Sequence, residues 1–210
     1  MLTLAIDCAT EACSVALLDD GELVAGELRL LGRGHAEQLI PMIAALPGKG
    51  RAARIAVSQG PGSFTGVRVG LAAAKGLALA WRAELVGYPT LALVAAMAQR
   101  GRAEPVAVAM TGGHGEWFVQ GFGSDGMAVR ELASYRPDAA AAATPERLVA
   151  GSQAEALVMA RGTGEALPLR PDARALGLLV QAHLRGDPAP LYGRAPDARL
   201  PAPPVAEQAG

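Results

Sequence analysis

The segment from Ser58 to Gly76 constrains the fold of this 210-residue chain more than any other. It reads SQGPGSFTGVRVGLAAAKG, which predicts the end of a buried strand, a glycine-rich loop and the start of an apolar helix. Glycine allows backbone conformations and close approaches that a Cβ atom prevents. We therefore expect structural roles for the loop residues, with Ser63 or Thr65 as a helix cap; these residues are Gly60, Gly62, Ser63, Thr65, Gly66 and Gly70.

The helix predicted at residues 67–81 has almost no polar surface. Its charged residues are Arg68 and Lys75, with Arg82 just beyond, and a seven-residue spacing places them in one narrow stripe. The rest of the circumference is apolar and must be covered. The sequence leaves two possibilities for what buries this surface: the core of an α/β sandwich, or another protein chain.

Composition excludes several classes of function. With 19 basic and 20 acidic residues, the chain lacks the basic surface of an autonomous nucleic-acid binder, and 4% aromatic residues argue against a base-stacking surface. Cys8 and Cys13 are too few for a disulfide framework, so we expect buried, reduced thiols. The start of the chain lacks a basic signal-peptide segment, and no apolar run reaches the ~18 residues of a membrane span. We expect a cytoplasmic protein that does not contact a membrane.

The order of predicted elements indicates two similar halves, at residues 1–102 and 103–200, followed by a disordered tail at 201–210. In the first half we predict strands at 2–7, 13–18, 22–30, 54–58 and 84–87, with helices at 35–46, 67–81 and 91–99. In the second half we predict strands at 105–110, 117–122, 127–133 and 156–160, a helix start at 144–146 and a helix at 171–184. Because the β-hairpin opening occurs twice, we expect two subdomains that face one another.

Few side chains suit catalysis or metal binding. The glycine-rich loop is not a P-loop, because it has no Gly-Lys-Ser/Thr and Lys75 lies too far along the helix. An anion site at the helix N-terminus stays open. His35, His114 and His183 do not cluster in sequence, so we expect no histidine-based metal site. No Ser-His-Asp arrangement is recognisable, and neither cysteine has a basic neighbour.

A β-meander with Asp7 at the end of its first strand, followed by alternating helices and strands, resembles the actin-like (ASKHA, ribonuclease H-like) α/β fold of sugar kinases, Hsp70 and actin. In that superfamily the first hairpin binds phosphate through an Asp-x-Gly-Thr pattern. Here the pattern is Asp-Cys-Ala-Thr, and Ala9 places a methyl group where the phosphate would approach. We interpret Asp7, Ala9 and Thr10 as a vestigial phosphate loop and expect no cofactor on this chain.

Four segments together closely resemble the TsaB (YeaZ) family of the bacterial threonylcarbamoyladenosine pathway: LAIDCATEACSVALL, GHAEQLIPMI, GPGSFTGVRVGLAAAKGLAL and YPTLALVAAMA. They cover most of residues 2–100 in order. The second half agrees less, because Thr-Gly-Gly-His at 111–114 stands where family members carry Asp-Ala-Arg. Residues 190–194 resemble the family's terminal P-x-Y-x-R element.

The resemblance implies a non-catalytic partner of TsaD, the enzyme that transfers threonylcarbamoyl to the adenosine beside the anticodon of tRNAs reading codons that begin with A. It also implies a third component, the ATPase TsaE, with ATP and a metal ion on the partner subunits and tRNA contacted through the complex. Without TsaD, we expect a self-paired dimer.

We predict that the helices beginning at His35 and Val67 pack against the equivalent pair of TsaD. The predicted partner-binding residues are His35, Leu39, Met42, Ile43, Arg68, Val69, Ala73 and Leu77. The sequence does not separate the interface residues in this set from core residues.

Two other functions stay open. The first is an independent actin-like ATPase or sugar kinase, against which Ala9 and the missing metal ligands count. The second is a glycoprotease, which would need a nucleophile or a metal that we do not find in the sequence.

Overall fold

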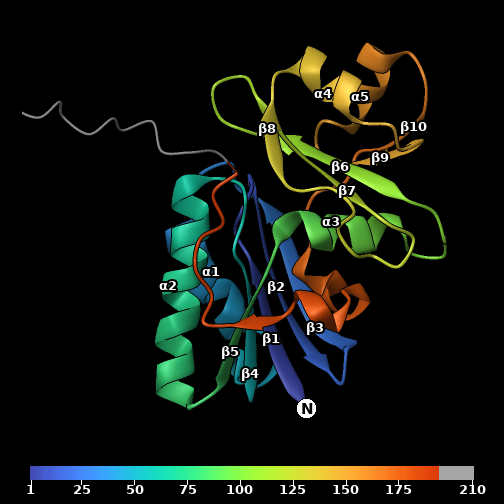
Figure 1. Cartoon of the computed structure of the whole chain (residues 1–210). Helices are drawn as coiled ribbons and strands as arrows, with labels where there is room; N and C mark the ends of the chain where they lie inside the picture. The colour runs from blue at the N-terminus through green and yellow to red at the C-terminus, as the bar shows by residue number, and fades with distance from the viewer. Residues whose placement is uncertain (194–210) are drawn as a thin grey trace, which may run out of the picture.

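Two β-sheets, each covered by helices, make up the molecule (Figure 1). The computed structural model describes residues 1–193, so Arg194 and the tail predicted at 201–210 lie outside the described residues.

The first sheet has the strand order β11-β5-β4-β1-β2-β3. β1, β2 and β3 form an antiparallel meander, β4 and β5 extend it in parallel from β1, and β11 pairs antiparallel with β5. The strands are β1 (Leu2–Asp7), β2 (Ala12–Asp19), β3 (Glu22–Leu30), β4 (Arg54–Ser58), β5 (Glu84–Tyr88) and β11 (Arg185–Gly186).

The second sheet repeats this plan with the order β10-β9-β6-β7-β8. β6, β7 and β8 form the meander, and β9 and β10 extend it in parallel. The predicted actin-like α/β fold of two similar subdomains is thereby confirmed. The strands are β6 (Val106–Thr111), β7 (Trp117–Phe122), β8 (Ala133–Tyr135), β9 (Leu148–Ala150) and β10 (Glu165–Leu167).

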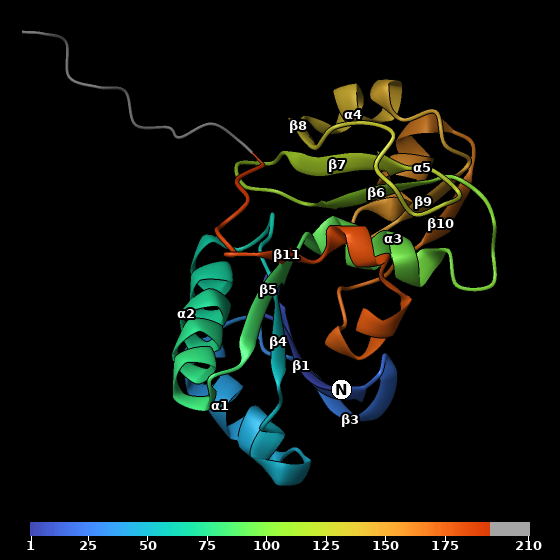
Figure 2. The same cartoon turned by 60° about the horizontal axis from the view of Figure 1, so that its bottom comes forward.

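The helices form three layers around the sheets. α1 (His35–Ala45) and α2 (Phe64–Trp81) cover one face of the first sheet, and the 3₁₀ turn η1 (Pro47–Gly50) follows α1. α3 (Thr90–Ala98) lies between the two sheets, and α4 (Pro137–Ala143) and α5 (Ala154–Arg161) cover the outer face of the second (Figures 1 and 2). Because both sheets contact α3, its residues Leu91 to Ala95 are all buried.

The elements predicted in the first half are confirmed to within a few residues. α2 begins earlier than predicted because Ser63 caps it: the Ser63 hydroxyl accepts a hydrogen bond from the Gly66 amide at 3.2 Å. α1 begins at His35 and continues through Pro41.

The strand predicted at 127–133 is wrong. β8 begins at Ala133, and Ala128 forms only an isolated bridge to β7. The amides of Val129 and Arg130 both donate to the Gly121 carbonyl, and this shared acceptor interrupts the ladder that an extended strand would form.

Two further predictions in the second half are wrong. Thr144 ends a helix rather than starting one, because its hydroxyl donates to the Ala140 carbonyl of α4 at 2.7 Å. The strand predicted at 156–160 is helix α5, which buries Ala154 and Leu157, three residues apart. A short apolar run does not distinguish a strand from a helix.

The helix predicted at 171–184 is instead two 3₁₀ turns, η2 (Ala173–Leu178) and η3 (Gln181–His183). The buried residues Ala173, Leu176 and Leu179 recur every three positions, which matches the 3₁₀ period. η2 packs on β2 and β3, and β11 follows on the same sheet. η2 and β11 therefore lie with the first sheet, although the predicted division places them in the second half; the boundary at 102 stays a prediction.

Candidate functional site

The glycine-rich loop packs directly on the turn that joins β1 to β2. A Cβ atom on Gly62 would collide with the Ala9 carbonyl, and one on Gly66 would collide with the Cys8 carbonyl. The Ser63 amide donates to the Ala9 carbonyl at 2.7 Å. These glycines are therefore needed because two backbone segments touch.

The other predicted loop residues have different surroundings. Gly60 has φ +88°, a conformation that favours glycine. Gly70 faces the side chains of Cys8 and Val57 at 3.6 Å from its ideal Cβ position. Thr65 lies within α2, whereas Ser63 precedes the helix and accepts from the Gly66 amide, so Ser63 supplies the cap.

The carboxyl group of Asp7 is enclosed where β1, β4 and β5 end. Asp7 is 1% exposed, and it accepts hydrogen bonds from the Ala9 amide at 3.0 Å and the Tyr88 hydroxyl at 3.3 Å. Burial raises the pKa of Asp7 to about 6, opposed by hydrogen bonds from Ala9, Ser58 and Tyr88. Of the three residues predicted as a vestigial phosphate loop, Ala9 and Thr10 line the cleft described next, whereas Asp7 is buried and does not line it.

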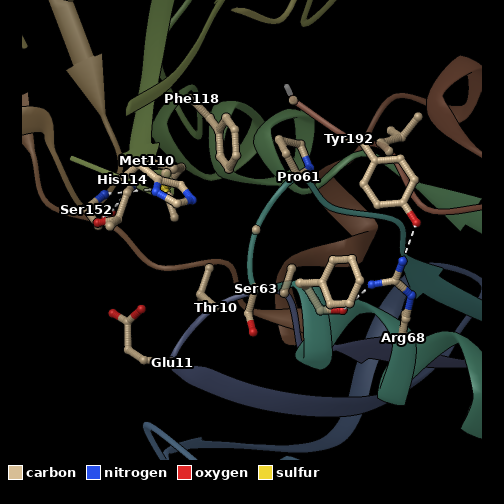
Figure 3. A pocket seen from close by; sticks show the side chains of 18 of the residues that line it. Thr10, Glu11, Pro61, Ser63, Arg68, Met110, His114, Phe118, Ser152 and Tyr192 are labelled. Atoms are coloured by element: carbon tan, nitrogen blue, oxygen red, sulfur yellow. Dashed lines mark hydrogen bonds between the residues drawn. The ribbon is translucent and has the colours of Figure 1, made fainter. Parts of the chain in front are cut away.

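A cleft of about 780 Å³ opens beside this turn, between the two sheets (Figure 3). Its walls come from the β1–β2 turn, the glycine-rich loop, the β6–β7 turn and residues 191–193. Large apolar side chains are prominent among the lining residues, namely Pro61, Phe64, Met110, Phe118 and Leu191.

Several polar side chains of the cleft already have partners within the chain. The hydroxyl of Ser152 lies 3.1 Å from that of Thr111, and Arg170 donates to the Glu11 carboxylate at 2.7 Å. Among the described residues that line the cleft there is no lysine. The basic side chains of the lining are Arg68 and His114, and Arg68 is held at the rim of the cleft.

Arg68 lies at the rim of the cleft and is held by two aromatic residues for which the sequence had suggested no role. Its guanidinium carbon lies 3.2 Å from the centroid of the Phe64 ring, and it donates to the Tyr192 hydroxyl at 2.7 Å (Figure 3). Tyr192 is brought here by its neighbour Leu191, whose amide donates to the Gln59 carbonyl at 2.8 Å. The resemblance to the P-x-Y-x-R element was the signal that could have directed attention to Tyr192.

The predicted partner-binding residues of α1 lie in the core of this chain. Leu39, Met42 and Ile43 are between 1% and 3% exposed, and they pack in the core between the helices and the first sheet. His35 is 8% exposed, and its Nε2 lies 2.8 Å from the Thr10 carbonyl, which ties α1 to the β1–β2 turn. In this conformation none of the four presents a surface to a partner.

On α2 the predicted residues Val69, Ala73 and Leu77 are half-buried against the same core, and Arg68 is exposed. The outward side of the two helices carries another apolar set, which we call the docking surface. It consists of Ile40, Pro41 and Ala44 of α1 with Ala72, Gly76 and Leu79 of α2, all exposed.

The docking surface has two prominent side chains and one gap. Leu79 is 83% exposed and Ile40 is 48% exposed. A Cβ atom on Gly76 would have no described heavy atom within 4 Å. The surface is therefore open to a neighbour that no described residue supplies.

The remaining candidate chemistry is limited. The Cys8 and Cys13 sulfur atoms lie 3.5 Å apart as free, buried thiols, as predicted. Within residues 1–193, no three His, Cys, Asp or Glu side chains gather as a metal site, and no helix there has the length and apolar character to span a membrane. The absence of a cofactor stays a prediction.

Comparison with known proteins gives sequence matches in one pathway. The family model for TsaD, tRNA N6-adenosine threonylcarbamoyltransferase, matches residues 29–170. The tRNA threonylcarbamoyladenosine biosynthesis protein TsaB of Escherichia coli K12 is 44% identical over 105 residues, which are 48% of this chain and 45% of that protein. TsaB of Haemophilus influenzae is 46% identical over 80 residues, 36% of this chain and 34% of that protein. The matched part of the chain thus spans half or less of these curated relatives.

Solved structures match over nearly the whole chain. A Pseudomonas aeruginosa protein described as similar to the peptidase YeaZ superposes with a TM-score of 0.75 at 30% identity, covering 92% of this chain and 99% of that chain. YeaZ from the same organism gives a TM-score of 0.74 at 28% identity, covering 91% of this chain and 99% of that chain. The family model for TsaD covers most of the chain, and the named relatives are TsaB and YeaZ proteins. The chain therefore belongs to the TsaB (YeaZ) family.

Proposed function

We propose that this chain is a non-catalytic scaffold subunit that binds and activates a TsaD-family enzyme in the biosynthesis of threonylcarbamoyladenosine in tRNA. The observation that carries the proposal is the docking surface, where Leu79 and Ile40 are exposed on two neighbouring helices. Exposed apolar surface of this kind favours association with another protein. The named relatives supply the pathway.

The shape of the docking surface suits another helix pair. Ala72 and Gly76 have little or no side chain, so a second backbone can approach α2 closely, as in tightly packed helix pairs. Leu79 and Ile40 flank this gap as apolar anchors. The equivalent helices of TsaD would complete a bundle and hold the enzyme in its active conformation. A second copy of this chain would take the same place when TsaD is absent.

The composition of the cleft supports a role without catalysis. Its lining has Arg68 at the rim but no lysine among the described residues, and Ala9 stands where the phosphate-binding pattern has glycine. ATP and a metal ion would instead be bound by the partner subunits TsaD and TsaE. tRNA would be contacted through the assembled complex.

The cleft of about 780 Å³ keeps one alternative open, an independent actin-like ATPase or sugar kinase. Titration calorimetry of the lone chain with ATP and magnesium distinguishes the two. If the chain is a scaffold, the titration should give no measurable heat of ATP binding. Micromolar binding of ATP would favour the ATPase or sugar kinase.

The scaffold is tested by replacing an exposed apolar residue with a charged one. Leu79→Asp should abolish co-elution with the TsaD-family enzyme of the same organism and lower reconstituted tRNA modification by about tenfold or more. Met159→Asp is the matched control, because Met159 is 81% exposed, on α5 of the other subdomain. If folded Leu79→Asp supports modification as well as the control does, the docking surface is not the interface.

A further inference from the structure

A stripe of three exposed cations runs along α2 beside the docking surface. Arg68, Lys75 and Arg82 are seven residues apart, and each is exposed. None of them takes part in an ion pair with a carboxylate among residues 1–193. The sequence of α2 contains no acidic residue. The stripe is therefore uncompensated within the described chain.

One of these cations is held in place before any partner arrives. The guanidinium of Arg68 lies over the Phe64 ring, donates to the Phe64 carbonyl at 3.3 Å and donates to the Tyr192 hydroxyl at 2.7 Å. Neither acceptor is charged, so the positive charge remains available. Because the side chain is already ordered, binding an anion there costs less conformational entropy than binding one to a free arginine.

The stripe and the docking surface lie on the same side of α2. Ala72 follows Arg68 by four residues and Leu79 follows Lys75 by four, a spacing that places each pair on one side of a helix. α2 runs along the outer edge of the molecule (Figure 1). A helix lying over Ala72 and Leu79 would therefore also cover the cations, and covering an unpaired charge is costly.

A second copy of this chain is a poor match for the stripe. In a two-fold pairing of antiparallel α2 helices centred near Lys75, Lys75 meets Lys75 and Arg68 meets Arg82, since residue i faces j and j faces i. The sequence of α1 offers one acidic residue, Glu37. Like charges would thus face one another across most of such a contact.

We propose that the partner helix seated on α2 presents Asp or Glu carboxylates at seven-residue intervals to Arg68, Lys75 and Arg82, and that this charge match selects the partner over a second copy. The inference rests on the proposed scaffold function and names the chemistry that its partner must carry. Charge complementarity of this kind contributes specificity and association rate.

Charge reversal tests the proposal. Lys75→Glu should weaken binding to the TsaD-family enzyme by about tenfold or more at ~0.1 M salt, and it should reduce the salt dependence that the native chain shows. Arg100→Glu is the matched control: Arg100 is exposed just beyond α3, and the change in net charge is the same. The control should bind as the native chain does.

A steric variant separates this inference from the proposed function. Gly76→Gln adds an uncharged side chain where no described atom lies within 4 Å, so it should fold normally and block the docking surface. If Gly76→Gln abolishes binding and Lys75→Glu binds like the native chain, the charge match is wrong and the scaffold stands. If both variants bind like the native chain, the scaffold itself is wrong.

Self-association supplies a second readout. Lys75→Gln removes the central like-charge contact, so sedimentation should show a dimer several-fold tighter than that of the native chain. Unchanged or weaker self-association would overturn the proposed selection against a second copy.

Discussion

The glycines on the inward and outward sides of α2 have opposite surroundings. Inward, Gly66 lies against the Cys8 carbonyl and Gly70 against the Cys8 side chain, so the helix can rest directly on the first sheet and its turn. Outward, Gly76 has open space around it. The inward glycines are required by this chain's own backbone, whereas the outward one leaves room that no described residue fills.

The apolar side chains of α1 divide in the same way. Leu39 and Met42 are each 1% exposed and belong to the core, whereas Ile40, next to Leu39 in sequence, is 48% exposed. Substitutions on the inward sides should therefore change stability, and those on the outward sides should change association.

The largest effect on stability is expected for Gly66→Ala. The added methyl group would collide with the Cys8 carbonyl, which is backbone and does not move aside easily. We expect a loss of about 3 kcal/mol or more in the free energy of unfolding, measured by urea denaturation. A loss below ~1 kcal/mol would mean that the inward contact is not needed.

The buried Asp7 carboxyl should make stability depend on pH. Its pKa is about 6 in the folded chain against an ordinary value of 3.8, so the folded state binds the proton more tightly than the unfolded state does. The resulting stabilisation is complete below about pH 4 and is lost as the pH rises through 6, a change of about 3 kcal/mol at most.

Asp7→Asn should remove that part of the pH dependence, because its amide does not titrate and can keep contacts with Ala9 and Tyr88. Urea denaturation between pH 4 and pH 7 measures the difference from the native chain. If the free energy of unfolding changes with pH in the same way for both proteins, burial does not raise the pKa of Asp7 as described.

The smallest effect on stability is expected for Gly76→Ala, and it has the opposite sign. Alanine fits the open space and favours helix over glycine, so the free energy of unfolding should rise by about 1 kcal/mol in thermal or urea denaturation. If Gly76→Ala is instead less stable than the native chain, the space around Gly76 is not open and the contrast with Gly66 fails.

The fold of the first half could be predicted because its signals are local. The glycines and Ser63 mark the loop and the helix start, and the spacing of Arg68 and Lys75 marks the exposed side of α2. The same spacing could have pointed to Leu79, four residues after Lys75, as an outward residue. The layer that covers Leu39 depends on the tertiary fold, so sequence did not assign that residue to the core.

Other features depend on contacts between distant parts of the chain. Tyr192 bonds to Arg68 across 124 positions of sequence, which no local pattern reveals. The run at 171–184 carries apolar residues at a spacing that suits an α-helix and 3₁₀ turns alike. In the structure this run forms 3₁₀ turns, and η2 packs on β2 and β3.

Titration calorimetry between the TsaD-family enzyme and Gly76→Gln tests the docking surface most directly. Ala160→Gln is the matched control, because Ala160 is an exposed small residue on α5. We predict that Gly76→Gln binds at least about tenfold more weakly than the native chain and that Ala160→Gln binds equally well. Equal affinity of all three proteins would contradict the account.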